Sequence, residues 1–389
     1  RLMTIFDSIV DRKNSDSVKW NGMQRIYGTN DLLPMWVADT DFRAPQEVID
    51  ALIERVQHGI FGYAVTPERL YDVVIDWAQK RYHWNIKKEW IVLCSGVVKS
   101  IAFSIQALTN EGDKILIQPP IYPPFVRMIE KNNRVVVRNP LRLKNNRYEI
   151  DFDHFEKQLQ SGVKLVLLCS PHNPTGRVWT REELRKMADL CEQYDVPIVS
   201  DEIHGDVIFQ PNVQIPISSL DEKTQERTIT LFAPSKTFNI PGLQCSIMVI
   251  PNSQFRRKIK MQMDQVAFHG PNVLSLVATE AAYAYGEDWL DELNQYLQKN
   301  VVTTKRFIER EISGLRVIPP EGTFLVWIDY RELGLNESEF MNCLIQKGKL
   351  ALEPGTKYGP EGEGFVRMNI GCPEQTLMDG LQRLKDALT

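Results

Sequence analysis

The sequence is poor in the features that mark secreted, membrane-bound and metal-binding proteins. Six cysteines are present and none forms a Cys-x-x-Cys pair, so buried free thiols are expected and no disulfide framework or metal site. No uncharged apolar run approaches the ~18 residues that a membrane helix requires. The segment Arg1–Val10 carries Asp7 and lacks the apolar centre of a signal peptide. We therefore expect a cytoplasmic protein with no membrane partner.

Concentrated positive charge is also missing. The formal net charge of the 389 residues is -4, and the pI is about 6.0. Nucleic-acid-binding surfaces usually carry a basic stripe, and the longest basic run here is the triplet Arg256–Lys258. With 43% hydrophobic and 25% charged residues and no repeat of fixed period, the composition is that of an ordinary globular protein without a nucleic-acid partner.

From about residue 45 onward, the sequence alternates between predicted strands and predicted helices. The strands are short apolar runs rich in Val, Ile and Leu, a pattern typical of strands that are buried on both faces. Helices are predicted at Val98–Leu108 and at Arg181–Tyr194, the latter after a capping box of Thr180 and Glu183. We predict an α/β fold whose large domain has a mainly parallel seven-stranded sheet flanked by helices. The predicted strands are Ile91–Cys94, Lys114–Ile117, Arg134–Val137, Leu165–Cys169, Ile198–Ser200, Thr228–Phe232 and Ser246–Ile250.

The C-terminal part of the chain has a different order of elements. A long helix is predicted at Trp289–Ile312 and a shorter one at Gln375–Ala387, with three strands between them. The strands are predicted at Leu315–Ile318, Phe324–Asp329 and Phe365–Asn369. This order predicts a smaller α+β domain at residues 287–389 beside a large domain at residues 46–286. We expect the N-terminal segment, residues 1–45, to join the smaller domain.

Unusual polar residues follow several predicted strands, where open α/β sheets bind their ligands. The turn Ser95–Ser100 joins a strand to a helix, and such a turn presents backbone N–H groups and the helix dipole to an anion. It is neither a Walker loop nor a Gly-x-Gly-x-x-Gly fingerprint, which argues against nucleotide binding. The loop Ser170–Arg177 contains two prolines and a glycine that fix its shape around Asn173. Taken alone, each segment is equally compatible with an ordinary rigid turn.

Two ionisable residues also come directly after apolar strands. Asp201 is costly to bury there unless its carboxylate pairs with a cation, and a protonated pyridine nitrogen would be such a cation. Lys236 follows another apolar strand, and a lysine amine in an apolar pocket loses its proton more readily and can attack an aldehyde. A structural salt bridge for Asp201 and a surface position for Lys236 are the alternatives.

Taken together, these residues resemble the fold-type I pyridoxal-phosphate enzymes, the aspartate aminotransferase superfamily. Within it, the sequence is most similar to the MalY/PatB group of cystathionine β-lyases, also called C–S lyases. The resemblance extends over nearly the whole chain and depends on the order and spacing of several motifs. These are Val18–Trp20, Met35–Phe42, Phe61–Tyr63, Ser170–Arg177, Ser200–His204, Pro234–Gly242 and Phe365–Asn369.

The resemblance implies pyridoxal 5'-phosphate as the cofactor and gives five residues a role at its ring. Lys236 is expected to form the Schiff base and to act as acid and base at the substrate's Cα. Asp201 would pair with the pyridine nitrogen, so that the ring withdraws electrons from Cα. Asn173 would bind the phenolic oxygen, His204 is a second candidate for the same edge, and Tyr122 would stack on the ring.

The resemblance also implies how the phosphate is held. The backbone at Val97 and Val98, together with the Ser235 hydroxyl, would bind it. Tyr63 is similar to a tyrosine that reaches the phosphate in the partner subunit, so a homodimer with shared active sites is expected. Many aminotransferases of the superfamily carry a phosphate-binding arginine several residues after the lysine, whereas Gly242–Cys245 supplies no charge here. This departure fits the lyase group and leaves the neutralisation of the phosphate open.

Two residues are expected to contact the amino-acid substrate. Arg367 resembles the arginine that binds the substrate carboxylate, a task suited to its two-pronged donor geometry. Trp36 is similar to an aromatic residue at the substrate entrance, and packing in the core is an equally ordinary position for it.

Three functions remain open on the sequence. The first is β-elimination, which would convert L-cystathionine into homocysteine, pyruvate and ammonia, or release sulfide from L-cysteine. The second is transamination, which needs the same lysine and aspartate. The third is a regulatory protein that binds pyridoxal phosphate without turnover, which has no need for an electron-withdrawing ring and a carboxylate-binding arginine together. The match to the lyase group favours elimination.

Overall fold

A seven-stranded sheet forms the centre of the computed structural model, which describes residues 3–389. Its strand order is β2-β10-β9-β8-β7-β3-β4, and only β10 runs antiparallel to its neighbours. The predicted mainly parallel sheet of an α/β fold is therefore confirmed. Its strands are β2 (Ile91–Cys94), β3 (Lys114–Ile117), β4 (Val135–Arg138), β7 (Leu165–Cys169), β8 (Ile198–Asp201), β9 (Thr228–Phe232) and β10 (Ser246–Val249).

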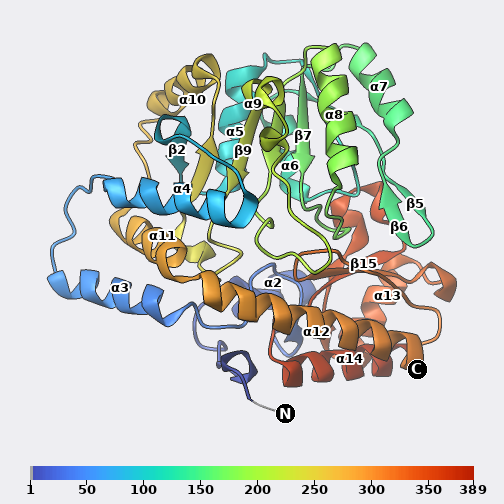
Figure 1. The fold of residues 1–389 in the computed structure, drawn as a ribbon. Coiled ribbons are helices and arrows are strands. Elements are labelled where there is room, and N and C mark those ends of the chain that lie inside the picture. The colour runs from blue at the N-terminus through green and yellow to red at the C-terminus, as the bar shows by residue number, and fades with distance from the viewer. Residues whose placement is uncertain (1–2) are drawn as a thin grey trace.

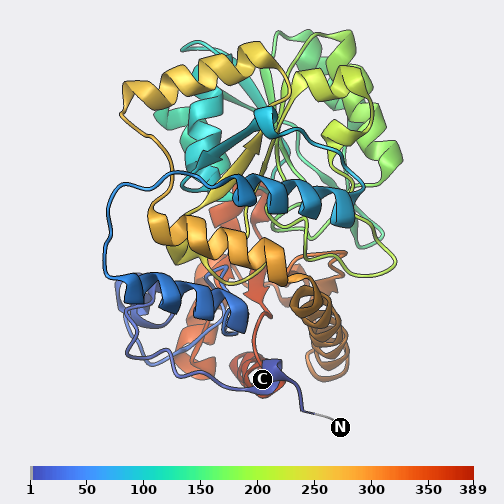
Figure 2. The same ribbon diagram turned by 60° about the vertical axis from the view of Figure 1, so that its left-hand side comes forward.

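Helices cover both faces of this sheet (Figures 1 and 2). Successive side chains of a strand point to opposite faces, so Ile115 and Ile117 join one apolar cluster while Leu116 joins another. The first cluster is completed by α5, α6 and α10, and the second by α7 and α8. The bounds of these helices are α5 (Val97–Leu108), α6 (Pro123–Lys131), α7 (Phe152–Gln160), α8 (Arg181–Gln193) and α10 (Ser253–Gln265). The capping box of Thr180 and Glu183 is present at the start of α8.

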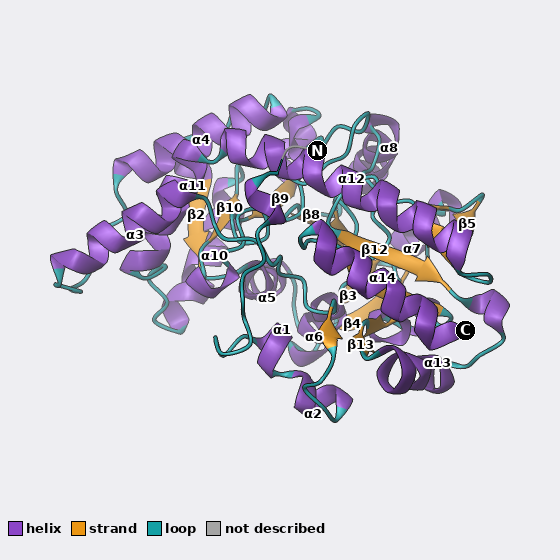
Figure 3. Ribbon diagram, turned by 90° about the horizontal axis from the view of Figure 1, so that it is seen from below, coloured by secondary structure: helices purple, strands orange, loops and turns teal. Residues whose placement is uncertain are grey.

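A second, antiparallel sheet has the order β11-β12-β15-β14. Its strands are β11 (Arg316–Ile318), β12 (Leu325–Asp329), β14 (Glu353–Pro354) and β15 (Phe365–Asn369). Helices α12 (Glu287–Glu311) and α14 (Glu374–Leu388) lie side by side next to it (Figure 3). The N-terminal segment is attached to this part because β1 (Leu33–Pro34) pairs with β13 (Leu350–Ala351). The domain boundaries at residues 45 and 286 stay a prediction.

The remaining helices lie around these two sheets. They are α1 (Val18–Asn21), α2 (Met23–Tyr27), α3 (Gln46–His58), α4 (Glu68–Tyr82), α9 (Glu222–Arg227), α11 (Val273–Tyr285) and α13 (Glu337–Cys343). Across residues 3–389, no helix has both the length and the apolar composition needed to cross a membrane.

The sequence pattern placed the predicted strands to within one or two residues, but it missed one hairpin and the two-residue strands β1, β13 and β14. β5 (Arg142–Lys144) and β6 (Arg147–Glu149) pair through a turn at Asn145 and Asn146, both of which have a positive φ. Such a two-residue turn matches the twist of antiparallel strands. These strands are short and rich in charged residues, so they lack the apolar run on which the prediction depended.

The loop Ser170–Arg177, which follows β7, is anchored to both halves of the structure by Arg177. The Arg177 guanidinium donates to Glu183 of α8 at 2.6 Å, to Glu321 near β12 at 2.7 Å, and to the carbonyl of Tyr148 in β6 at 2.6 Å. Because Arg177 is only 2% exposed, these bonds are shielded from water. The loop is thereby fixed at the end that follows Asn173.

A close approach of two backbones also constrains this loop. Gly176 has a φ of +74°, and a Cβ atom there would lie 2.9 Å from Cα of Pro320. Only glycine satisfies both conditions without displacing the neighbouring chain.

We expect Arg177→Met to lower the free energy of unfolding by about 3 kcal/mol, because it leaves two partly buried carboxylates without their cation and a buried carbonyl without its donor. Arg185→Met is the matched control, since Arg185 pairs with Asp189 and Asp221 at the surface, where such pairs contribute at most about 1 kcal/mol. Urea unfolding monitored by circular dichroism measures both. Equal losses in the two variants would contradict the anchoring role of Arg177.

The ion pair of Arg177 and Glu183 also predicts that the stability of the protein depends on pH. Burial alone would raise the pKa of Glu183, but its bonds to Arg177 and to the Thr180 backbone hold that pKa below the usual value. The stabilisation is therefore complete above the ordinary glutamate pKa of about 4.3 and is lost as the pH falls further. The difference between wild type and Arg177→Met should shrink in acid.

Candidate active site

A buried cavity of about 180 Å³ lies at the carboxyl ends of the central strands. This is where parallel α/β sheets bind ligands, because the loops that follow the strands converge there. The cavity brings together most of the site residues that the sequence predicted, namely Val97, Val98, Tyr122, Asn173, Asp201, His204, Ser235 and Lys236. Residues to which the sequence analysis gave no binding role complete the wall, among them Ala38, Cys169, Ile203, Pro241, Gln244 and Cys245.

Lys236 follows β9, and its side chain lies inside the protein. Its Nζ atom donates to the carbonyl of Ala38 at 2.8 Å. Burial lowers the pKa of Lys236 to about 8, and the charge of Arg367 acts in the same direction, while Asp39 and Asp201 oppose it. The lowered pKa makes more of this amine neutral near neutral pH than in an exposed lysine, and the neutral amine is the form that attacks an aldehyde.

Asp201 closes β8 and is 3% exposed. Burial raises its pKa to about 7, although a bond from the Ile203 N–H and the charge of Lys236 oppose the rise. The adjacent Glu202 does not line the cavity, because its carboxyl group accepts from the Ser200 hydroxyl at 2.7 Å behind the strand. Asp201 is thus the carboxyl group that faces the cavity, and a cation beside it would stabilise its charged form.

His204 contributes a polar atom that is left without a partner. Its Nδ1 is buried and forms no hydrogen bond within residues 3–389. Burial lowers the pKa of His204 to about 3, helped by the charges of Lys236 and Arg367, so the ring is neutral. Buried polar groups are normally hydrogen-bonded, and an orphaned one on a cavity wall indicates a place for a ligand.

Arg367 of β15 does not line the cavity itself, but it contacts Asn173, which does. Its guanidinium donates to Asn173 Oδ1 at 3.3 Å and to the carbonyl of Trp36 at 2.7 Å, and its plane lies over the ring of Tyr358. The Nε atom is buried and has no hydrogen-bond partner among the described residues. This fork therefore keeps donor capacity for an anion such as a carboxylate.

Trp36 itself lies beside the cavity. Its indole N–H donates to the carbonyl of Lys19 at 2.9 Å, and its ring packs edge-on against Tyr27. The side chain is 3% exposed, so it occupies the core position that was the alternative for this residue. A role at the substrate entrance stays a prediction.

The segment Trp36–Phe42, here called the strap, contributes Ala38 to the wall of the cavity. Side chains from distant parts of the chain bind its backbone carbonyl groups at 2.7–3.1 Å. The donors and their carbonyls are Arg367 (Trp36), Asn369 (Val37 and Asp39), Lys236 (Ala38), Lys19 (Asp39), Arg12 (Thr40) and Asn239 (Thr40 and Phe42). The position of Lys236 is therefore coupled to the N-terminal segment and to β15.

A cluster of four charged residues holds the strap from its outer side. Lys19 is 1% exposed, and its Nζ lies 3.0 Å from Asp41 Oδ2. Arg12 donates to both Asp39 and Asp41 at 2.8 Å, and Trp20 donates to Asp41 at 3.0 Å. Burial alone would raise the pKa of Asp41, but these partners lower it overall. The sequence motifs contained Lys19, Trp20, Asp39 and Asp41 without giving them a role, and Arg12 lay outside every motif. Two carboxylates in the mainly apolar stretch Met35–Phe42 were the available signal.

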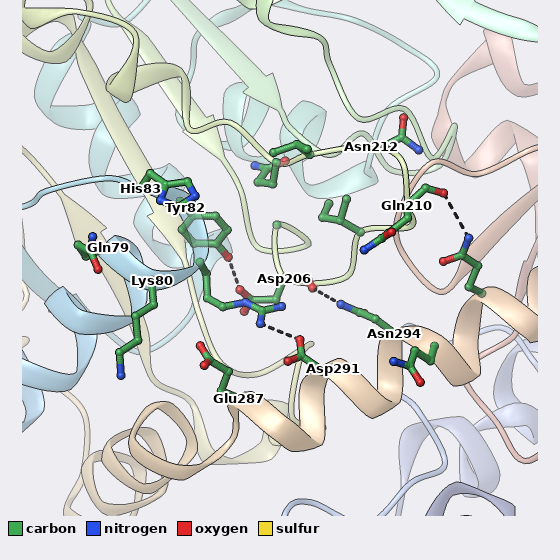
Figure 4. Close-up of a pocket in the computed structure, with 17 residues that line it drawn as sticks. Gln79, Lys80, Tyr82, His83, Asp206, Gln210, Asn212, Glu287, Asp291 and Asn294 are labelled. Carbon is green, nitrogen blue, oxygen red and sulfur yellow. Dashed lines mark hydrogen bonds and ion pairs between the residues drawn. The ribbon is translucent and has the colours of Figure 1, made fainter.

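The segment from Asp201 to His204 is also supported on the side that faces away from the cavity. There a polar groove of about 1000 Å³ lies between α4 and α12, with Asp206 on its floor (Figure 4). The Asp206 carboxylate accepts from Tyr82, from Trp77 Nε1 at 3.0 Å and from Thr237 Oγ1 at 2.7 Å. Because Thr237 directly follows Lys236, Asp206 fixes the lysine loop from behind.

Tyr63 lies away from this cavity. It belongs to the segment between α3 and α4, which swings out at the margin of the molecule (Figures 1 and 2). Its side chain is fully exposed, and it stands among other exposed apolar residues, namely Ile53, Val56, Ile60, Phe61 and Val65. Within its own chain, Tyr63 does not line the cavity.

The cavity residues fit pyridoxal phosphate. Lys236 offers an amine for its aldehyde, Asp201 a carboxyl group for its ring nitrogen, and Asn173 and the unpartnered His204 polar atoms for its ring edge. The first turn of α5, at Val97 and Val98, offers backbone N–H groups for its phosphate.

Comparison with known proteins gives close relatives along the whole chain. The chain is 43% identical to the cystathionine beta-lyase PatB of Bacillus subtilis over 99% of this chain and 100% of that protein. It is 34% identical to the protein MalY of Escherichia coli over 98% of both. Among solved structures, cystalysin from Treponema denticola, which contains pyridoxal 5'-phosphate, superimposes with a TM-score of 0.96 at 33% identity over 100% of this chain and 99% of that one.

The family itself follows from the extent of these matches. The family model for aminotransferase class I and II matches residues 31–384, which include the strap, the lysine loop and β15. Since the matching region carries every element that converges on the cavity, the chain belongs to the aminotransferase class I and II family.

Proposed function

We propose that this chain is a pyridoxal-phosphate-dependent carbon–sulfur lyase that cleaves thioether amino acids by β-elimination. The observation that carries the proposal is the buried Lys236 amine, which shares one cavity with Asp201 and lies close to Arg367. The names of the relatives support the choice of reaction, because PatB is a cystathionine beta-lyase. With L-cystathionine and water as substrates, the products would be homocysteine, pyruvate and ammonia.

The bound cofactor supplies an electron-withdrawing ring that stabilises negative charge at the substrate's Cα. Lys236 Nζ would bind the cofactor aldehyde, and its neutral amine would take the proton from the substrate's Cα. The Cβ–S bond breaks as its electron pair leaves with sulfur as a thiolate, which then takes up a proton. Asp201 would keep the ring nitrogen protonated.

Arg367 and Asn173 orient the substrate in this scheme. Arg367 keeps Nε free for the substrate carboxylate, while its two other nitrogens are bound by Asn173 and by the strap. The carboxylate would thus be held in a fixed direction, which decides which Cα bond stands perpendicular to the ring. Tyr122 would stack on the ring, and Ser235 with the backbone of Val97 and Val98 would bind the phosphate.

Transamination is the second candidate, since it uses the same lysine and aspartate. The family includes aminotransferases, and no residue of the cavity separates the two reactions. Elimination is favoured because a β-thiolate departs readily once Cα carries negative charge, whereas transamination needs a proton delivered to the cofactor carbon. A regulator that binds the cofactor without turnover would not need Arg367.

We further propose a homodimer and a cytoplasmic location. The exposed apolar residues around Tyr63 support an interface between two copies, because contiguous exposed apolar patches mark interaction sites. Tyr63 would then reach the phosphate in the partner subunit. The six free thiols, five of them buried, are typical of a reducing compartment.

The reaction type is tested with purified protein, added pyridoxal phosphate and L-cystathionine. We expect pyruvate and thiol in large excess over the glutamate formed from added 2-oxoglutarate, and no product from Lys236→Ala. Coupled assays for pyruvate, thiol and glutamate give the ratio. Glutamate as the main product with several amino-acid donors would show an aminotransferase instead.

We expect Asp201→Asn to lower the rate of the reaction without lowering the stability of the protein. We expect kcat to fall by about 10²–10³-fold, the usual cost of losing one placed electrostatic partner. Burial raises the pKa of Asp201 in the folded protein to about 7. Ionising its carboxyl group therefore lowers the stability of the folded protein once the pH rises above the pKa that Asp201 has in the unfolded chain. The cofactor-free variant should therefore melt no lower than wild type at pH 8. Near-normal turnover of the cofactor-loaded variant would rule out the role of Asp201.

The shared site is tested by complementation between two inactive or weakened variants. Tyr63→Phe should bind the cofactor less tightly, and Lys236→Ala should be inactive. A heterodimer of the two contains one site with both Lys236 and Tyr63 intact, so the mixture should exceed the mean of its parents at limiting cofactor. Sedimentation that shows a fully active monomer would refute the dimer proposal.

A further inference from the structure

The end of the cavity that would take the cofactor phosphate has little positive charge in its wall. Among the described residues that line the cavity, Lys236 is the only lysine or arginine, and its amine is committed to the aldehyde. His204 is neutral, since burial lowers its pKa to about 3. A phosphate monoester carries about -1.5 to -2 charges at pH 7, and a buried charge is costly without compensation.

The helix terminus at this end supplies only part of the positive charge that the phosphate needs. α5 begins at Val97 and has 12 residues, so its first turn offers backbone N–H groups and a partial positive charge of roughly +0.5. Gln244, on the opposite wall, stands eight residues after Lys236 and carries no charge. A cation next to the wall would meet the remaining deficit.

Lys99 occupies this position. It is the third residue of α5, and its Nζ donates to Ser95 Oγ at 2.7 Å. Ser95 lines the cavity, and Lys99 is exposed, so its ammonium group reaches this lining residue from the solvent side. Its other contact is with the face of the Phe268 ring at 5.4 Å. Neither contact is with a carboxylate, so the charge of Lys99 remains available to an anion.

We propose that Lys99 is the cation that neutralises the cofactor phosphate, acting beside Ser95 from the first turn of α5. The inference rests on the proposed function, in that the ligand is a phosphate monoester joined to the aldehyde that Lys236 binds. Independently, the unpartnered Nδ1 of buried His204 marks the same cavity as a ligand site. Lys99 would thereby replace the charged residue that is absent from the segment after Lys236.

Two ligands that differ only in the phosphate test this assignment. Cofactor-free protein is titrated with pyridoxal 5'-phosphate and with pyridoxal, and binding is followed by the absorbance of the bound ring. In Lys99→Met, the Kd for pyridoxal 5'-phosphate should rise about tenfold, the usual effect of losing a hydrogen bond to a charged group, while the Kd for pyridoxal should not change. Lys99→Arg, which keeps the charge, should restore tight binding.

The matched control is Lys258→Met, which removes one exposed lysine from α10 and so changes the net charge equally. It should leave both dissociation constants unchanged. Equal weakening of both ligands in Lys99→Met would mean a general structural effect and overturn the proposal, as would no weakening of either. If wild type itself fails to bind pyridoxal 5'-phosphate, the cofactor assignment falls first, a result that no Lys99 variant can mimic.

Discussion

The backbone carbonyl groups of the strap, Trp36–Phe42, need hydrogen-bond donors. The side chains that supply these bonds determine the geometry of the site. Extended chain that crosses the interior without a sheet partner must satisfy its polar groups through side chains. Here the donors come from the N-terminal segment, the lysine loop and β15. The buried pair of Lys19 and Asp41 fixes the strap from outside, because separating those charges would leave a lysine unpaired in the core.

This arrangement joins both sheets at the strap. Lys236 comes from the central sheet and Arg367 from the smaller one, and both bind carbonyl groups of the same strap. A change at the strap therefore alters the amine and the guanidinium together. Asp206 supplies the opposing support, because it ties the residue after Lys236 to α4. The lysine is held between these two supports.

Burial gives the ionisable groups of the cavity their reactivity. It lowers the pKa of Lys236 to about 8 and raises that of Asp201 to about 7, so each group loses its charge more easily than an exposed group of its kind. Such groups bind an aldehyde and a ring nitrogen readily, since the new partner relieves a desolvation penalty. The phosphate differs from these two groups, because a shift in its pKa cannot remove all of its charge. It therefore needs a cation, for which we propose Lys99.

The sequence by itself determined the central sheet and the residues that follow its strands. Buried parallel strands are continuous apolar runs, so local pattern located β7 and β9 and, after them, Asn173 and Lys236. Tertiary structure decided how these residues are connected. The bond from Arg367 to Asn173 spans 194 residues, and that from Lys236 to Ala38 spans 198. No local periodicity encodes such contacts, because they depend on how the two sheets and the strap pack together.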